Sequence, residues 1–500
     1  MSDSFFIRGR VLWAGLALLI LPFAARAQAD RAAPAAAISL ADALKLAGQA
    51  SHTVRAAEAG LLRARGQGYQ ARAQYFPQLN FSGGYQRTIE SQFAAISKGS
   101  GSDTSSTNGS SSSGSSSSNN SLANISKIFA APNTVTLGLN FSQNLFTAGK
   151  LTAANKGADA ARTAAEIGLD AARAQLVLDV AQAYFDAVAS EQLVQIADST
   201  LAQTERTLQQ TTVSRQVGSA AEFDLLRARV ARDNQRPAVI QARGNRDIAF
   251  LRLRQLLGIP LNQPLALTTP IRDDDTADAA PKPLVLTQPI MFPGDDRGLV
   301  PDTNVNRRST VRQAAATVMA QEFALRAANW ERFPLLQFKS LYQRFGYPAE
   351  GRILPNSFGL FYPNWTATLG FSFPVFTGGR LTGDKMIAAA NLAEARQSLE
   401  QARELAALDA RQAITQLEQA AANYAASVGT GQQAAKAYSI AEVRFREGIS
   451  TQVELQQSRT QYEQARLNRV TAARDLEVAR LKVALLKDLP VGGLTASVRR

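Results

Sequence analysis

The chain has 500 residues, a formal net charge of +13, one histidine and no cysteine. The lack of cysteine excludes a thiolate nucleophile, a cysteine-based zinc or iron–sulfur site, a disulfide framework and a lipidated N-terminal cysteine. Lys and Arg are spread along segments that also contain Asp, Glu and Gln, a pattern typical of solvated helix faces. We therefore expect no nucleic-acid partner.

The N-terminus has the pattern of a secretory signal peptide. Arg8 and Arg10 precede an apolar run at 11–25, which is shorter than the roughly 20 residues that a membrane-spanning helix needs. A small-x-small triplet follows and predicts cleavage after Ala27, with Ala29 as the alternative. We therefore expect residues 1–27 to be removed on export.

The two halves of the chain repeat one another. Residues 76–81, which contain a Phe-Pro pair, resemble residues 333–338 at an offset of 257. Residues 146–151 resemble residues 376–381 at an offset of 230. The offsets differ by 27, and a stretch of Ser, Gly, Asn and Thr at 97–121 supplies the extra length. The sequence thus predicts a duplicated architecture with a Ser-rich loop in its first copy.

The repeat sets the expected domain boundaries. A first repeat at 28–258 is joined to a second repeat at 307–488 by a Pro- and Asp-rich segment at 259–306, and a tail at 489–500 follows. The connecting segment is expected to carry one short strand, at 265–268.

Each repeat is expected to begin with a helix of moderate length. In the first repeat Ser39 is placed to cap that helix, with Asp42 three residues later as a weak capping box. The Ala-rich sequence then continues to about Gln74, and Pro77 ends it.

Strands are predicted where large apolar residues alternate with small or polar ones. Each such segment is about nine or ten residues long, the length that crosses a bilayer when tilted. A soluble sandwich also alternates, but in a barrel the apolar face meets lipid and the small polar face lines water. The expected strands are 77–87, 134–144, 334–344 and 365–375.

Long helices follow the second strand of each repeat. Apolar residues there recur with heptad spacing, as in Ala410, Ile414, Leu417 and Ala421, which indicates a coiled-coil seam. A glycine then interrupts each helical run and favours a tight turn to an antiparallel return helix. Pro237 is expected to kink the first return helix. The expected helices are 152–217, 220–257, 382–447 and 451–487.

Four strands cannot close a barrel by themselves, so the sequence predicts an oligomer. Two chains would give eight strands with a filled interior, and three would give twelve with an aqueous lumen. The small polar inward residues favour three. The predicted fold class is mostly α with membrane β: long antiparallel coiled-coil helices form a trimeric α-barrel, and four strands per chain contribute to a twelve-stranded β-barrel.

The ordered motifs of the chain resemble those of the TolC-type outer-membrane efflux family, and the resemblance covers residues 38–490 of the mature chain. The motifs are a signal peptide, duplicated halves, Phe-Pro before a strand, Phe-Thr-Gly-Gly-Arg after one, and a Gly-bearing helix turn. The resemblance implies a homotrimer in the outer membrane that extends into the periplasm. It implies the exit duct of a tripartite efflux or type I secretion system, with a periplasmic adaptor and an inner-membrane pump as partners and no cofactor.

The resemblance also implies site residues. Gln457 stands where the family has a second acidic gate residue, Ser450 replaces an arginine and Phe445 replaces a tyrosine, which alters the family's latch. Three copies of Glu454 around a threefold axis would repel one another and attract cations. The implied gate consists of Asp224, Phe445, Ser450, Glu454 and Gln457. The implied adaptor-docking tips contain Arg215, Val217, Gly218, Ser219, Arg446, Gly448 and Ile449. The strand-to-helix turns are expected at Gly149, Gly378 and Gly379.

Other functional classes fit the sequence less well. His52 lies in the first helix with no nucleophile–acid arrangement around it, and no phosphate-binding loop is present, so we expect no enzymatic activity. A diffusion porin would need many more strands and less helix. An envelope coiled-coil protein without transport activity is the alternative, but it leaves the alternating strands unexplained.

Overall fold

We describe the fold from a computed structural model. The predicted signal peptide, the Ser-rich segment and nearly all of the predicted tail lie outside the described residues. The described residues are 36–89, 133–271, 290–292, 295–299, 302–348 and 361–491.

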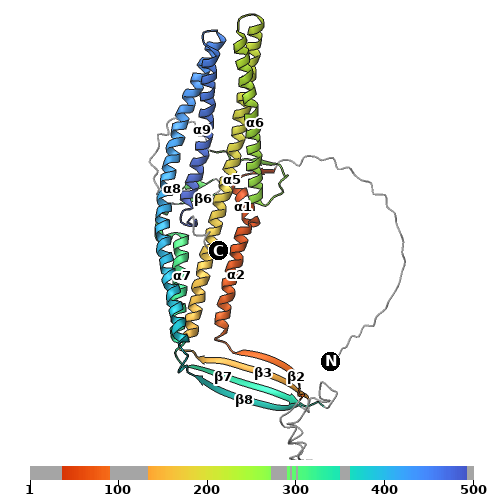
Figure 1. Ribbon diagram of the computed structural model, residues 1–500, viewed down its shortest axis with the longest axis vertical. Coiled ribbons are helices and arrows are strands. Elements are labelled where there is room, and N and C mark those ends of the chain that lie inside the picture. Colours follow the sequence, from red (N-terminus) through yellow and green to blue (C-terminus); the bar gives the residue numbers. More distant parts are fainter. Residues whose placement is uncertain are drawn as a thin grey trace, which may run out of the picture.

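Two long helical hairpins form most of the molecule (Figure 1). The first joins α5 (Lys150–Gln216) to α6 (Glu222–Leu257), and the second joins α8 (Arg380–Arg446) to α9 (Gln452–Ala484). α5 and α8 have 67 residues each, a length of about 100 Å at 1.5 Å per residue. None of the described helices combines the length and apolarity needed to cross a membrane.

The helix expected after Ser39 is interrupted in the structure. Ser39 does cap α1 (Leu40–Ala50), since its hydroxyl accepts a hydrogen bond from the Asp42 N–H at 3.2 Å. The chain then breaks at Ser51, whose hydroxyl accepts from the Val54 N–H at 3.3 Å and caps a second helix, α2 (His52–Ala73). A second N-cap serine thus divides the segment into two helices.

The remaining helices and short strands pack along the hairpins. α7 (Ser309–Trp330), preceded by the 3-10 turn η1 (Val305–Arg307), lies between α5 and α8. β1 (Ala36–Ile38) pairs in parallel with β4 (Leu265–Leu267), within the strand expected at 265–268. The connecting segment also contains a small antiparallel pair, β5 (Ile290–Phe292) and β6 (Asp295–Leu299), so the expectation of a single short strand there was wrong.

A four-stranded antiparallel sheet lies at the end of the helical column opposite the hairpin tips (Figure 1). The strand order is β2-β3-β7-β8, so the two halves of the chain meet at the central β3–β7 pair. The strands are β2 (Gln78–Arg87), β3 (Asn133–Phe146), β7 (Leu335–Gly346) and β8 (Phe361–Ser372).

The start of the last strand differs from the sequence expectation. The last strand was expected at 365–375 but begins at Phe361 and includes Pro363. Because β8 is an edge strand, a proline there costs no hydrogen bond within the sheet if its missing N–H lies on the open side. Pro237, where the sequence predicts a kink, lies inside the continuous helix α6.

The sheet has one apolar and one polar face. The register aligns Leu79 with Phe141, and Phe141 with Ser340, along one face. The large apolar side chains of that face are exposed in the single chain: Phe81, Trp365 and Phe371 are 70%, 74% and 70% accessible. The polar face carries mostly Gln, Asn, Ser, Thr and Gly.

The hydrophobic core is centred on α5. Val180, Tyr184 and Leu253 are fully buried there, together with residues from α1, α2 and α9. The Tyr184 hydroxyl donates to the Ile38 carbonyl at 3.1 Å and accepts from the Thr269 N–H at 2.9 Å. This one side chain therefore ties the β1–β4 pair to the middle of the first hairpin.

A buried ion pair anchors the second half of the chain. The Arg308 side chain is inaccessible to solvent, and its Nη2 donates to Asp409 Oδ2 of α8 at 2.5 Å. Next to it, the Ser309 N–H donates to the Lys487 carbonyl and its hydroxyl donates to the Leu489 carbonyl. The start of α7, the middle of α8 and the end of α9 are thus held together.

Asp409→Ala is expected to destabilise the protein by about 3–5 kcal/mol, because it leaves the Arg308 guanidinium buried and unpaired. Glu166→Ala is the matched control. It removes an exposed pair, Glu166 with Arg162 at 2.9 Å, and should cost less than about 1 kcal/mol. Thermal unfolding followed by far-ultraviolet circular dichroism measures both. Equal melting temperatures for the two variants would contradict the anchoring role.

Candidate functional site at the hairpin tips

The two hairpins turn with the same backbone geometry. At the first tip, the Ser219 and Ala220 N–H groups both donate to the Ser214 carbonyl, at 2.9 and 3.2 Å. At the second tip, the Ile449 and Ser450 N–H groups both donate to the Arg444 carbonyl, at 2.8 and 3.2 Å. Each donor and acceptor of the second tip lies 230 residues after its equivalent in the first tip. These bonds satisfy carbonyl groups that would otherwise be unpaired at the helix ends.

Glycine is required at each turn by its backbone conformation. Gly218 has a φ of +80° and Gly448 a φ of +73°, in the left-handed region that side chains disfavour. A Cβ added at either position would have no atom within 4 Å. The constraint therefore lies in the backbone and not in crowding.

Apolar side chains are exposed around both turns. Val217 and Phe223 are 73% and 63% accessible at the first tip, and Ile449 is 69% accessible at the second. Val213 and Val443, which match at the 230 offset, are also exposed. Such clusters on a surface mark contact sites for another protein.

Each tip carries one ion pair between its two helices, and the pairs are not equivalent. Arg215 Nε lies 3.0 Å from Glu222 Oε2 at the first tip, and Arg444 Nη1 lies 3.0 Å from Glu454 Oε1 at the second. All four side chains are about half exposed. Glu454 is therefore not an isolated carboxylate, since an arginine ten residues earlier compensates its charge.

The other expected gate residues do not form one cluster in the single chain. Asp224 lies in the first turn of α6, with no side-chain partner among the described residues. Gln457 is exposed one turn beyond Glu454. Phe445 is half-buried, and the Ser450 hydroxyl is buried without a hydrogen-bond partner in the described chain.

A layer of two half-buried tyrosines and the buried Arg459 lies below the second tip. The rings of Tyr438 and Tyr462 stack with centroids 5.7 Å apart. Burial lowers the pKa of the Arg459 guanidinium and raises the pKa of the Tyr438 hydroxyl. This layer joins α8 to α9 behind the exposed apolar residues of the second tip.

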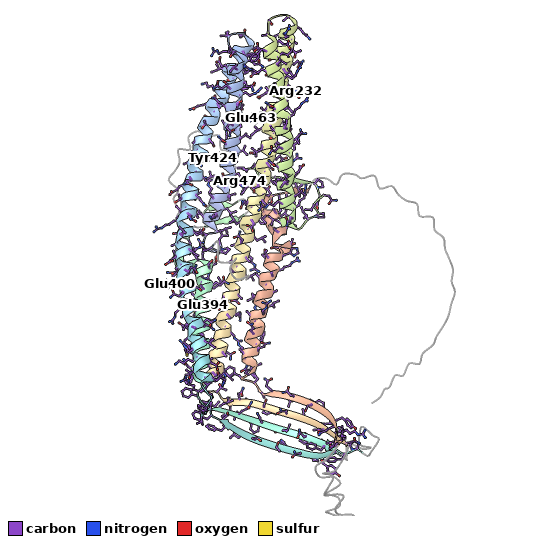
Figure 2. All side chains as sticks on the ribbon, viewed as in Figure 1. Arg232, Glu394, Glu400, Tyr424, Glu463 and Arg474 are labelled. Atoms are coloured by element: carbon purple, nitrogen blue, oxygen red, sulfur yellow. The ribbon has the colours of Figure 1, made fainter. Side chains whose placement is uncertain are left out.

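Polar contacts connect the two hairpins below the tips. The Gln235 amide of α6 donates to Glu463 of α9 at 3.1 Å, and Arg466 Nη1 donates to Ser199 Oγ of α5 at 2.9 Å. Farther from the tips, Arg474 Nε donates to Asp186 Oδ1 of α5 at 2.6 Å. Figure 2 shows Glu463 and Arg474 along this line, between the tips and the middle of the column.

The expected strand-to-helix turns contain left-handed glycines. Gly149 has a φ of +97° and N-caps α5, and Gly379 has a φ of +88° and N-caps α8. Gly378 precedes it at +59°, whereas the corresponding position in the first half is Ala148 at +50°. A Cβ on Gly149 would lie 3.5 Å from the Trp330 ring. These turns direct both long helices away from the sheet.

Sequence reasoning missed the ion pair at each tip. It assigned neither Glu222 as the partner of Arg215 nor Arg444 as the partner of Glu454, yet each closes an interhelical ion pair. A signal was present: the two members of each pair lie close to the turn glycine and on opposite sides of it, where antiparallel helices face one another.

The chain belongs to the outer membrane efflux protein family, whose model matches residues 43–259 and 300–486. The resemblance found in the sequence is thereby confirmed. It places the chain among efflux proteins of the outer membrane and not among enzymes.

Two curated relatives come from two strains of Pseudomonas putida. They are the toluene efflux pump outer membrane protein TtgF and the probable efflux pump outer membrane protein SepC. Each is 28% identical to this chain over 273 residues, which is 53% of this chain and 51% of the relative. The chain thus matches about half the length of these relatives.

Solved structures share the fold over nearly the whole chain. The outer membrane protein VceC of Vibrio cholerae has a TM-score of 0.66 at 18% identity and covers 89% of this chain and 95% of its own. The CmeC outer membrane channel of Campylobacter jejuni has a TM-score of 0.67 at 15% identity and covers 91% and 87%. The mostly helical fold with four antiparallel strands is therefore that of TolC-type channel structures.

Gly448→Ala should weaken the second tip by about 1 kcal/mol, because alanine is strained at a φ of +73°. Gly429→Ala is the control: Gly429 is inside α8 with open space around it, so alanine should stabilise the helix by about 1 kcal/mol. Amide hydrogen exchange of peptides covering 436–456 measures the first change, and peptides covering 420–436 measure the second. Faster exchange in the first variant and slower exchange in the second are expected; slower exchange in both would contradict this account.

Proposed function

We propose that the chain is one protomer of a trimeric exit duct in the outer membrane, serving a tripartite efflux or type I secretion system. The observation that carries the proposal is the open four-stranded sheet with an exposed apolar face. In this proposal three sheets close into a twelve-stranded barrel, and the helical hairpins close into an α-barrel that extends into the periplasm.

The two edges of the sheet support closure by further copies. β2 and β8 each have a neighbour on one side only within the described chain. Each unsatisfied backbone group in lipid would cost several kcal/mol, so an open edge is not stable there. Three chains rather than two leave room for water, as the polar face of Gln, Asn, Ser and Thr requires.

The helical column supports the same assembly. The outer side of α6 has an apolar seam with no partner among the described residues: Val230, Ile240 and Ile248 are 58%, 72% and 65% accessible. Steps of eight to ten residues along one helix place these side chains on one broad stripe. We propose that a neighbouring protomer covers this stripe.

The proposed gate lies at the second tip. Glu454 is held by Arg444, so three copies would bring three ion pairs, not three bare carboxylates, to the threefold axis. Asp224, which has no partner in the described chain, supplies a charge that remains free to bind across the constriction. Opening would then require the tips to separate without breaking the ion pair of each hairpin.

A planar-bilayer experiment tests the proposed function. The purified protein should run as a trimer and give discrete single-channel currents. Glu454→Ala should change the conductance and the ion selectivity if Glu454 lines the constriction. A monomeric protein without conductance would instead support the alternative, an envelope coiled-coil protein. Currents that Glu454→Ala leaves unchanged would remove that residue from the gate but not the duct.

The exposed apolar residues of the two tips are the proposed docking surface for the periplasmic adaptor. Burying one such side chain contributes about 1.5–3 kcal/mol, so six copies of Val217 and Ile449 in a trimer would dominate the contact. The Val217→Ser, Ile449→Ser double variant should abolish pump-dependent drug resistance while the trimer level in the membrane stays normal.

The control for the docking variant is Leu62→Ser. Leu62 is 66% accessible on α2, far from the tips, and its replacement should leave resistance intact. Full resistance in cells that carry the double variant would refute docking through these residues.

A further inference from the structure

The polar face of the sheet carries one charged side chain among the described strand residues. The four strands contain three charged residues in all, Arg87, Lys339 and Arg344, and none is acidic. Arg87 and Arg344 share the face of Leu79 and Phe141, because Arg87 pairs with Asn133 and Arg344 with Leu137. Lys339 belongs to the opposite face.

The register places Lys339 among neutral neighbours. Its cross-strand partners are Ser142 of β3 and Thr368 of β8. Gln337 and Leu341, two residues away on either side, complete its surroundings on that face. Lys339 is exposed and has no salt-bridge partner within the described residues. A full positive charge therefore projects from this face without compensation.

The apolar face identifies the side on which this charge lies. Leu369 and Phe371 on β8 and Phe81 on β2 are more than 60% accessible on the opposite face. A surface of such residues is stable against lipid, and the polar face is stable against water. In a closed barrel Lys339 consequently lines the lumen, about 13 Å along the strand from its helix end at 3.3 Å per residue.

We propose that three copies of Lys339 form a positively charged ring in the lumen, which favours the passage of anionic solutes over cationic ones. The inference rests on the proposed trimeric duct. It assigns a selectivity element to the membrane part of the channel, distinct from the hairpin tips.

The size of the barrel makes such a ring effective. Twelve strands spaced 4.8 Å apart and tilted by about 40° enclose a barrel about 24 Å across. Each Lys339 Cα would then lie about 12 Å from the axis. The Debye length is about 10 Å at 0.1 M salt but about 3 Å at 1 M. The positive potential of the ring should therefore reach the barrel axis at low salt but remain close to the wall at high salt.

The ring is opposite in sign to Asp224, the tip carboxylate that has no side-chain partner in the described chain. At the second tip, Arg444 compensates Glu454, and at the first Arg215 compensates Glu222. Solutes with a carboxylate or sulfonate group would meet a favourable field in the barrel. Organic cations would meet an unfavourable one at the same level.

Reversal potentials in a KCl gradient across a planar bilayer test the ring. At about 0.1 M salt, Lys339→Gln should lower the chloride-to-potassium permeability ratio about threefold or more, since charge-lined clefts concentrate counter-ions at least tenfold. Lys339→Glu should lower it further. In about 1 M salt the three proteins should converge.

The lack of cysteine in the chain allows a second, reversible test. Lys339→Cys should respond oppositely to two thiol reagents. The cationic trimethylammonioethyl methanethiosulfonate should restore anion preference, and the anionic sulfonatoethyl methanethiosulfonate should reduce it. Ser340→Cys is the matched control, because the next residue along β7 lies on the apolar face, and neither reagent should alter its selectivity.

The possible outcomes distinguish failure of the proposed Lys339 ring from failure of the proposed duct. Wild-type channels that conduct but keep the same selectivity in Lys339→Glu at low salt would overturn the ring and leave the duct standing. A wild-type trimer that never conducts would overturn both. Equal reagent effects in the Lys339→Cys and Ser340→Cys variants would also overturn the ring, because the two positions would then share an environment.

Discussion

The backbone groups on the outer edges of β2 and β8 impose the constraint on which the rest of the molecule depends. A sheet of four strands leaves two edges unpaired, and one of its faces exposes Phe81, Trp365 and Phe371. Lipid suits that face but not the edges, and water suits the edges but not that face. Only pairing with further copies satisfies both demands. In the proposed trimer, the chain is therefore one third of a closed structure.

The internal repeat gives the helices the same twofold organisation as the strands. Each half contributes two strands and one long hairpin, and the halves join at the β3–β7 pair and through Arg474 and Asp186. The backbone hydrogen bonds of the two tips are equivalent, so the two hairpins of one chain turn in the same way. Their side chains differ, because the ion pair Arg444–Glu454 has no counterpart at the matching residues Ser214 and Asp224. In the proposed trimer, differences of this kind would divide six similar tips into two sets of three.

Local signals in the sequence predicted where the helices and strands lie, but not which residues of different elements contact one another. Alternation of apolar and polar residues located the strands, because one face of the sheet is apolar and the other is polar. The turn glycines located both tips. Pro363 obscured the start of β8, since a proline reads as a strand breaker unless the strand is known to be an edge. The break at Ser51 and the pairing of Glu454 with Arg444 depend on competing caps and on facing helices. The side on which Lys339 lies required the register between strands.

The central claim, that β2 of one chain pairs with β8 of the next, can be tested by cross-linking in this cysteine-free chain. One cysteine would replace Ser82 on β2, and a second would replace, in turn, Asn364, Thr366 or Thr368 on β8. Within one chain the two edges are three strand spacings apart, about 14 Å, so a linker of about 8 Å cannot join them. The account predicts a covalent trimer for at least one pair. Trimers that never form covalently, in protein that conducts, would contradict it.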